Sequence, residues 1–289
     1  MIHSDLFRQA ARLCVILSAS FSPGPDGIVS ADPVKNSRPP EAWKAEIEGP
    51  YDTKLRLELY NRIRGEFIDW FGDPIVNGRV VPKESSYSYF ANKFQLGLRV
   101  TGEAFEAFAQ FQDTVIAGLP TNGVGLGSAY FANTPKSTQN GTFLRQGWLK
   151  LKHEAFYVSG GRQLFADSAT GAANHKSLKW IKDFRLAQRL IGPFEFAHVA
   201  RSFDGGTLGY VSDDIEVSGF AFMPTFGGFE INGMKTISNI QVAGAAFNLR
   251  DSPSFGDSIG QLFYYYYSDD RNLVVTDNRA AAARASSKG

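Results

Sequence analysis

The first long segment of the chain alternates apolar and charged residues with a period of two. Its odd-numbered positions carry mainly apolar side chains, namely Leu55, Leu57, Leu59, Ile63 and Phe67. Its even-numbered positions carry polar and charged side chains, namely Arg56, Glu58, Tyr60, Arg62, Arg64 and Glu66. Because successive side chains of a strand point to opposite faces, the pattern predicts a strand with one apolar face and one charged face.

The same alternation recurs further along the chain. Residues 90–101 and 105–112 repeat it on either side of a short turn. Six later segments have the composition of strands but alternate less cleanly, namely 143–152, 156–165, 202–211, 215–223, 237–250 and 259–267. The chain therefore contains about nine predicted strands of roughly ten residues, the length that a tilted strand needs to cross a membrane.

The connections between these strands alternate in length. The long ones span 72–86, 115–142, 166–201 and 224–236, and the short ones span 102–103, 153–155 and 212–214. Outer-membrane barrels have this asymmetry, with short turns at one end and long loops at the other, whereas a sandwich has no reason to keep it. We predict an all-β fold, an antiparallel transmembrane β-barrel or part of a larger one, over residues 53–267.

The two ends of the chain have different compositions from this region. Arg8 and Arg12 precede a short apolar run at 13–21, so residues 1–31 are predicted to be a signal peptide rather than a buried amphipathic helix. Residues 32–52 form a predicted linker and 268–289 a predicted loop or disordered tail. The chain's single cysteine, Cys14, lies in the signal segment, so the exported chain is expected to have no thiol.

Composition and charge narrow the class of protein. The chain has 24 Phe, 11 Tyr and 4 Trp, a balance that suits strands and membrane interfaces. Lys and Arg (30) nearly cancel Asp and Glu (29), so no overall attraction to nucleic acid follows. No apolar run has the length of a membrane helix, which excludes a helical membrane protein.

If the apolar faces contact lipid, the opposite faces line an interior. That interior collects a set of charged residues: Arg56, Arg62, Arg64, Glu66, Lys93, Arg99, Lys150 and Lys152. Guanidinium groups with carboxylate neighbours can exchange partners with a passing carboxylate, which favours a pore for anions. The alternative is that these residues form mutual ion pairs that stiffen the wall. Residues 178–190, which are helical in pattern and basic, are interpreted as a constriction or as a surface helix.

Five motifs occur in a fixed order along the chain. They are Arg64-Gly65-Glu66-Phe67, Glu106-Ala107-Phe108-Ala109-Gln110-Phe111-Gln112-Asp113, Arg145-Gln146-Gly147-Trp148-Leu149-Lys150, Gly161-Arg162-Gln163 and Arg201-Ser202-Phe203-Asp204-Gly205. Over residues 55–279 the chain resembles the alginate-export family of outer-membrane porins. The resemblance implies passive diffusion or export of an anionic saccharide such as a polyuronate, with outer-membrane lipid and periplasmic export machinery as partners. It also implies a basic constriction containing Arg162, Arg201 and Asp204.

The chain departs from that family near its C-terminus. Family barrels have about twice as many strands and end on an aromatic residue, whereas residues 276–289 here are rich in Ala and polar residues. The sequence therefore suggests a shortened product that lacks the second half of a barrel.

Signs of catalysis are weak. The four histidines are scattered, and the paired acids Asp213-Asp214 and Asp269-Asp270 fall at strand ends, where turn residues are expected. The glycine-rich stretch 123–127 is interpreted as a flexible loop that opens no helix. We predict no catalytic residue, metal or cofactor. A soluble secreted β-domain that binds or cleaves acidic polysaccharide stays open as the alternative, because soluble sheets also alternate.

Overall fold

The computed structural model describes residues 43–69, 86–166, 180, 190–249 and 260–271, together with the backbone of four short strands. These strands are β1 (Ile16–Ala19), β4 (Ile75–Val76), β5 (Arg79–Val80) and β14 (Ser287–Lys288). Except for β1, the predicted signal peptide at 1–31 lies outside the described residues. The same holds for the helical prediction at 178–190, apart from Trp180 and Leu190.

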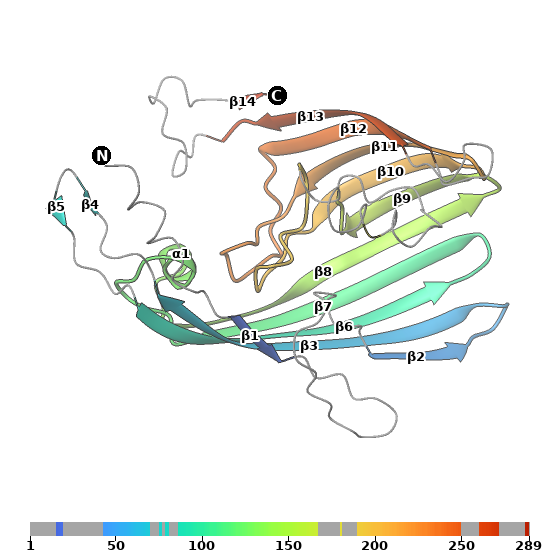
Figure 1. The fold of residues 1–289 in the computed structure, drawn as a ribbon. Coiled ribbons are helices and arrows are strands. Elements are labelled where there is room, and N and C mark those ends of the chain that lie inside the picture. Colours follow the sequence, from blue (N-terminus) through green and yellow to red (C-terminus); the bar gives the residue numbers. More distant parts are fainter. Residues whose placement is uncertain are drawn as a thin grey trace.

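One antiparallel sheet dominates the structure, and its long strands are neighbours in chain order (Figure 1). These strands are β3 (Lys54–Asp69), β6 (Ser86–Thr101), β7 (Phe105–Ala117), β8 (Thr138–His153), β9 (Phe156–Gln163), β10 (Phe203–Val211), β11 (Ile215–Pro224), β12 (Ile240–Leu249) and β13 (Gly260–Asp269). Strand β2 (Trp43–Glu48) and β1 both pair with β3, and β14 pairs with the end of β13. The sheet has twelve strands, or ten without the short β1 and β14.

The prediction of an all-β antiparallel fold is confirmed, and each of the nine predicted strands overlaps one of these long strands. The predicted closure into a barrel is not observed, because the sheet curves strongly but stays open (Figure 1). No pairing among the described strands joins β13 to the strands at the opposite edge. The linker prediction for 32–52 was wrong at Trp43–Glu48, which forms β2 although prolines flank it.

The connections alternate between the two ends of the sheet because each long strand pairs antiparallel with the next. The short turns at 102–104, 154–155 and 212–214 gather at one end. Helix α1 (Leu126–Asn133) lies at the other end (Figure 1), within one of the long connections. The predicted alternation of long and short connections is therefore confirmed from β3 to β12, and the connection between β12 and β13 is of intermediate length.

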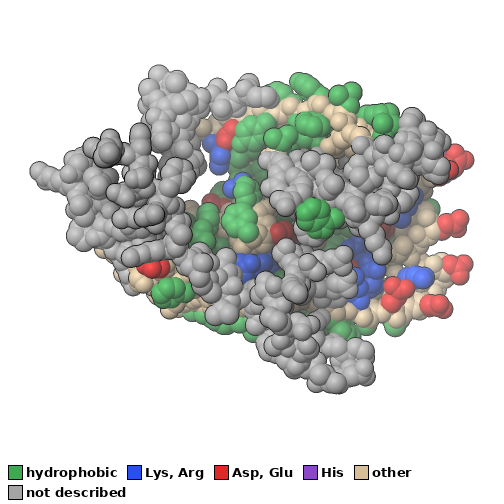
Figure 2. All heavy atoms as spheres, viewed as in Figure 1, with side chains coloured by type: hydrophobic (Ala, Val, Ile, Leu, Met, Phe, Trp, Pro, Cys, Tyr) green, Lys and Arg blue, Asp and Glu red, His purple; other side chains and the backbone are tan. Residues whose placement is uncertain are grey.

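The sheet buries its charged face and exposes its apolar face. On β6, Phe90, Phe94, Leu96 and Leu98 are 40–47% exposed, while Lys93 between them is 1% exposed. In Figure 2, hydrophobic side chains lie along the upper and lower margins, and charged side chains gather in the hollow between them and at one end. A protein dissolved in water has the opposite distribution, because buried charges and exposed apolar patches are both costly.

Two clusters of buried apolar side chains pack on the concave face. The first joins the strands to α1 and later loops through Ile68, Tyr87, Tyr89, Ala91, Ile116, Leu119, Tyr130, Phe143, Val199 and Ile231. The second contains Phe203, Phe220, Phe222, Ile237, Ile240 and Val242. These clusters hold the long connections against the strands, and the polar side chains between them form the candidate site.

Glycines of β9 and β10 lie opposite each other, and one of them also lies close against the backbone of β8. Gly161 lies opposite Gly205, and Gly160 lies opposite Gly206. Gly161 has a φ of +120°, and a Cβ atom there would lie 2.9 Å from the Cα of Trp148. A side chain at this position meets backbone atoms that cannot move aside, so the position requires glycine.

We predict that Gly161→Ala lowers the free energy of unfolding by about 1–3 kcal/mol, because it combines backbone strain with a backbone clash. Gly65→Ala is the matched control, since a Cβ atom there would meet nothing within 4 Å. Urea unfolding in detergent micelles, followed by tryptophan fluorescence, measures both variants. Equal stability of the two variants would contradict the close approach of β9 and β8.

Candidate functional site

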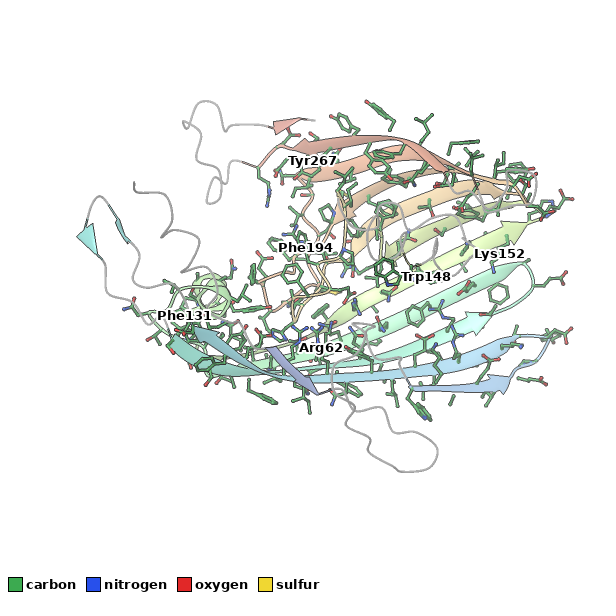
Figure 3. The ribbon with its side chains drawn as sticks, viewed as in Figure 1. Arg62, Phe131, Trp148, Lys152, Phe194 and Tyr267 are labelled. Carbon is green, nitrogen blue, oxygen red and sulfur yellow. The ribbon has the colours of Figure 1, made fainter. Side chains whose placement is uncertain are left out.

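A loop segment lies on the concave face and binds the strands through its backbone. This inner segment comprises residues 190–202, at the end of the connection between β9 and β10. Arg62 donates to the carbonyl oxygens of Glu195 (3.2 Å) and Ala197 (2.8 Å), and Arg64 donates to that of Phe196 (2.9 Å). Figure 3 shows Phe194 in the hollow of the sheet, above Arg62. The inner segment therefore narrows the concave side of the sheet.

Three buried cations surround one carboxylate of the inner segment. This cation cluster consists of Arg62, Lys93 and Arg145, which are 8%, 1% and 5% exposed. Lys93 Nζ lies 3.4 Å from Glu195 Oε2, and Arg145 forms an ion pair with Glu195 Oε1. Burial raises the pKa of the Glu195 carboxyl, but Arg145 and Lys93 outweigh burial and lower that pKa below its ordinary value. Glu195 is therefore ionised at neutral pH, and it is one carboxylate among three basic side chains.

A β-bulge brings Arg145 into the cluster. The register between β7 and β8 shifts at Gln110 and Phe111, which pair with Gln146 and Leu144. Arg145 is the extra residue between these pairs, so Arg145 and its neighbour Gln146 are both buried. In a regular strand one of the two would point to the convex face.

A second group of charges forms a ladder across four strands, near the end with the short turns. In this charge ladder Glu58 accepts from Arg56 (2.9 Å) and Arg99 (3.2 Å). Arg99 also pairs with Glu106, whose other oxygen lies 3.7 Å from Lys152 Nζ. Because Arg56 and Arg99 lie directly opposite each other in the sheet, the Glu58 carboxylate between them offsets their repulsion.

The Arg99 guanidinium of the charge ladder also packs on aromatic rings. It lies 4.2 Å from the ring centroid of Phe108 and 5.4 Å from that of Trp148. Both rings come from the neighbouring strands β7 and β8. These cation–π contacts and the two carboxylates hold the Arg99 guanidinium in place on the concave face.

Glu66 is at the centre of a third buried network. Its carboxylate accepts from Tyr89 and from Arg64, and it lies 2.9 Å from His198 Nε2 in the inner segment. Burial lowers the pKa of His198 below its ordinary value, although Glu66 raises it, so the ring is neutral at pH 7. Tyr130 of α1 accepts from the His198 backbone N–H (3.1 Å). The network therefore ties α1, the inner segment and β3 together.

The residues carried over from the family resemblance divide into two groups. Arg162 on β9 donates two hydrogen bonds to Asp204 on β10, at 2.7 and 2.8 Å, and Thr236 also donates to Asp204. Arg201 belongs to the inner segment, and its guanidinium lies 5.1 Å from the ring centroid of Phe194. The structure thus brings Arg162 and Asp204 together as a pair but gives Arg201 a different partner.

Lys150 lies beside a cavity on the concave face. Its Nζ is 4.1 Å from the ring centroid of Tyr157, which donates to Glu216 (3.4 Å). The cavity has a volume of about 370 Å³, and Glu106, Glu216 and Lys150 are its charged lining residues. Two carboxylates and one ammonium do not favour an anion there, so the cation cluster is the better anion site.

Sequence reasoning found most wall residues and missed those whose position depends on the bulge or on a loop. Arg145 was missed because the bulge changes the parity of β8: Phe143 is buried, whereas Leu149 and Leu151, also odd-numbered, are exposed. Glu195 and His198 were missed because loop residues follow no periodic pattern. Gln95 and Gln112, which hydrogen bond at 2.6 Å beneath the inner segment, were recognised only as polar strand residues.

The structure also bears on the features considered for catalysis. The interpretation of 123–127 as a loop that opens no helix was wrong, because Gly125 is the N-cap of α1. Asp213 and Asp214 lie in the turn between β10 and β11, as predicted. Within the described ranges, no three His, Cys, Asp or Glu residues lie close enough to hold a metal ion.

No helix in the described part of the chain is long and apolar enough to cross a membrane. Comparisons with protein-family models, curated proteins and solved structures found no match to this chain.

We predict that Arg162→Ala lowers the free energy of unfolding by about 1–3 kcal/mol, because it leaves the Asp204 carboxylate without its charged partner. Arg56→Ala is the matched control: the Arg56 side chain is 32% exposed and Glu58 keeps Arg99. Its expected cost is about 0–1 kcal/mol. Urea unfolding of both variants in the same detergent tests the difference, and a larger cost for Arg56→Ala would overturn it.

Proposed function

We propose that this chain forms the wall of an outer-membrane pore that passes an anionic saccharide, such as a polyuronate, by passive diffusion or export. The observation that supports this most directly is the distribution of side chains on β6. Leu96 and Leu98 are 40% and 47% exposed on the convex face, whereas Lys93 and Gln95 are 1% and 4% exposed on the concave face. The alternation thus directs apolar side chains outward and ionic side chains inward.

Lipid is the solvent that suits such a sheet. The apolar convex face extends over many strands, since Phe67, Phe111, Leu149, Val158, Leu208 and Leu262 are also exposed. In water, an apolar surface of this extent promotes association. Against hydrocarbon it is favourable, and the charged face then lines an aqueous interior, as in other transmembrane barrels.

The proposal requires that the open edges of the sheet become paired. Unpaired backbone N–H and C=O groups cost several kcal/mol each in hydrocarbon, so open edges do not occur there. Strand β13 pairs with β12 along its length, but on its other side β14 covers only Ser268 and Asp269. We propose that further strands complete the barrel in the membrane, as in the larger barrels of the alginate-export porins that the sequence resembles.

The interior suits an anionic saccharide because its cations outnumber its anions around the inner segment. The cation cluster offers ammonium and guanidinium donors, and among the described residues Glu195 is the one carboxylate that forms an ion pair with it. Such donors bind carboxylates through charge-assisted hydrogen bonds. The proposal assigns the chain no catalytic residue, cofactor or metal, and it includes outer-membrane lipid and periplasmic export machinery as partners.

The openness of the sheet favours a second candidate, a soluble secreted domain that binds or cleaves acidic polysaccharide along its concave face. The cavity beside Lys150 is lined by Trp148 and Tyr157, and aromatic rings of this kind stack on sugars. Cell fractionation separates the candidates. A pore is recovered from the membrane fraction with detergent, and recovery in the soluble periplasm without detergent would reject it.

We predict that Leu96→Arg lowers the free energy of unfolding in phospholipid vesicles by about 2–4 kcal/mol, because it places a charge in the apolar band of the convex face. Leu96→Met, which keeps the side chain apolar, is expected to cost less than about 1.5 kcal/mol. Urea titration of vesicle-inserted protein compares the two variants. An equal cost for both would show that Leu96 does not contact hydrocarbon.

We also predict that Arg99→Gln lowers the anion preference of the pore, because it leaves Glu58 and Glu106 with less positive charge. The expected fall in the chloride-to-potassium permeability ratio is at least about two-fold, or ~0.4 kcal/mol. Lys54→Gln is the matched control, because it removes one positive charge from a position on β3 where the side chain is 61% exposed. Reversal potentials in planar bilayers give the ratio, and an unchanged value for Arg99→Gln would make Arg99 purely structural.

A further inference from the structure

The cation cluster combines three basic side chains from strands with one carboxylate from a loop. Arg62, Lys93 and Arg145 belong to the long strands β3, β6 and β8. Glu195 belongs to the inner segment, a connection that packs against these strands. The strands of the sheet therefore fix the positions of the three cations. The Glu195 carboxylate, in contrast, belongs to a side chain of a loop.

The backbone of the inner segment is held without the help of the Glu195 side chain. Arg62 and Arg64 bind its carbonyl groups, Gln112 donates to the carbonyl oxygen of His198 (3.1 Å), and Ser202 donates to that of Arg145 (2.6 Å). The Glu195 carboxylate can thus leave the cluster by rotation of its side chain while the segment stays in place.

The geometry of the cluster matches a carboxylate ligand. The two Glu195 oxygens face different cations, with Oε2 toward Lys93 and Oε1 toward Arg145. The Nε atoms of Arg62 and Arg145 are buried without a hydrogen-bond partner, so the cluster has donors left over. The Glu195 side chain is 40% exposed, whereas those of Lys93 and Arg145 are 2% and 5% exposed. An anion that approaches from the concave side therefore meets Glu195 before it reaches the cations.

We propose that the cation cluster is a binding site for the carboxylate of an acidic sugar residue, and that Glu195 occupies this site until such a ligand displaces it. The inference rests on the proposed function and names the part of the concave face at which the saccharide binds. Buried cations left without a partner are strongly unfavourable, so exchange of one carboxylate for another keeps the cluster paired throughout. Glu195 thereby weakens binding enough for the saccharide to leave, which conduction requires.

The test uses the full chain in detergent micelles and D-glucuronate, a monomeric uronate, as the probe. Glu195→Gln removes the competing charge, so the dissociation constant for glucuronate is expected to fall about ten-fold. Glu230→Gln is the matched control. Glu230 also lies in a loop, where it accepts from the Gly227 backbone N–H (3.3 Å), and its removal is expected to leave the constant unchanged. Isothermal titration calorimetry measures both, with D-glucose as the uncharged reference.

Two further variants make the result decisive. Lys93→Gln in the Glu195→Gln background is expected to reverse the gain in affinity, because it removes a cation of the proposed site. Glu195→Asp has a shorter side chain that cannot reach both cations, so it is expected to raise the affinity for glucuronate, but by less than Glu195→Gln does. It replaces Glu195→Gln in the test if that variant fails to fold. Unchanged glucuronate affinity in these Glu195 variants, an equal gain in Glu230→Gln, or an equal gain for glucose would overturn the inference.

The binding measurement needs no membrane, so its failure is distinct from failure of the pore. A chain that conducts anions but binds glucuronate equally with and without Glu195 keeps the proposed function and loses this inference. A chain that gains affinity in Glu195→Gln but never inserts into bilayers keeps the site and loses the pore.

Discussion

The separation of apolar and ionic side chains onto opposite faces of one sheet is the constraint on which the rest of the structure depends. Along β3 and β6 the alternation places Arg62 opposite Lys93 and Arg56 opposite Arg99 on the concave face. Like charges directly opposite each other are destabilising, and their burial adds to the cost. Each pair of cations therefore needs a carboxylate close by, and this need explains where the acidic residues lie.

The two cation pairs meet this need in different ways. Near the short turns, Glu58 and Glu106 come from the strands themselves and join Arg56, Arg99 and Lys152 into the charge ladder. At the cation cluster the carboxylate comes from the inner segment. The first arrangement joins strand to strand, whereas the second joins strands to a loop. If the proposed function holds, wall stiffening and solute binding, which the sequence presented as alternatives, belong to different parts of one concave face.

The strands were predictable from the sequence because their pattern is local. Alternation over β3, β6 and β7 and the lengths of the connections were sufficient to place the long strands and to assign Lys93 and Arg62 to one face. Closure was not predictable, because it depends on whether β13 finds a partner, which is a property of strands far apart in the chain. The site was only partly predictable. Arg62 and Lys93 follow the period of the strands, but Arg145 depends on the bulge, and Glu195 reaches the cluster through a non-local contact with Arg145 and Lys93.

The bulge at Arg145 divides β8 into two halves of opposite parity. Before it, odd-numbered residues such as Phe143 point to the concave face, and after it even-numbered residues such as Gln146 do so. Deletion of the single residue Arg145 would restore an unbroken pairing between β7 and β8, with every flanking side chain still on its present face. The bulge thus adds one guanidinium group for Glu195 and one carbonyl group for Ser202 to a sheet whose own strand pairing needs neither.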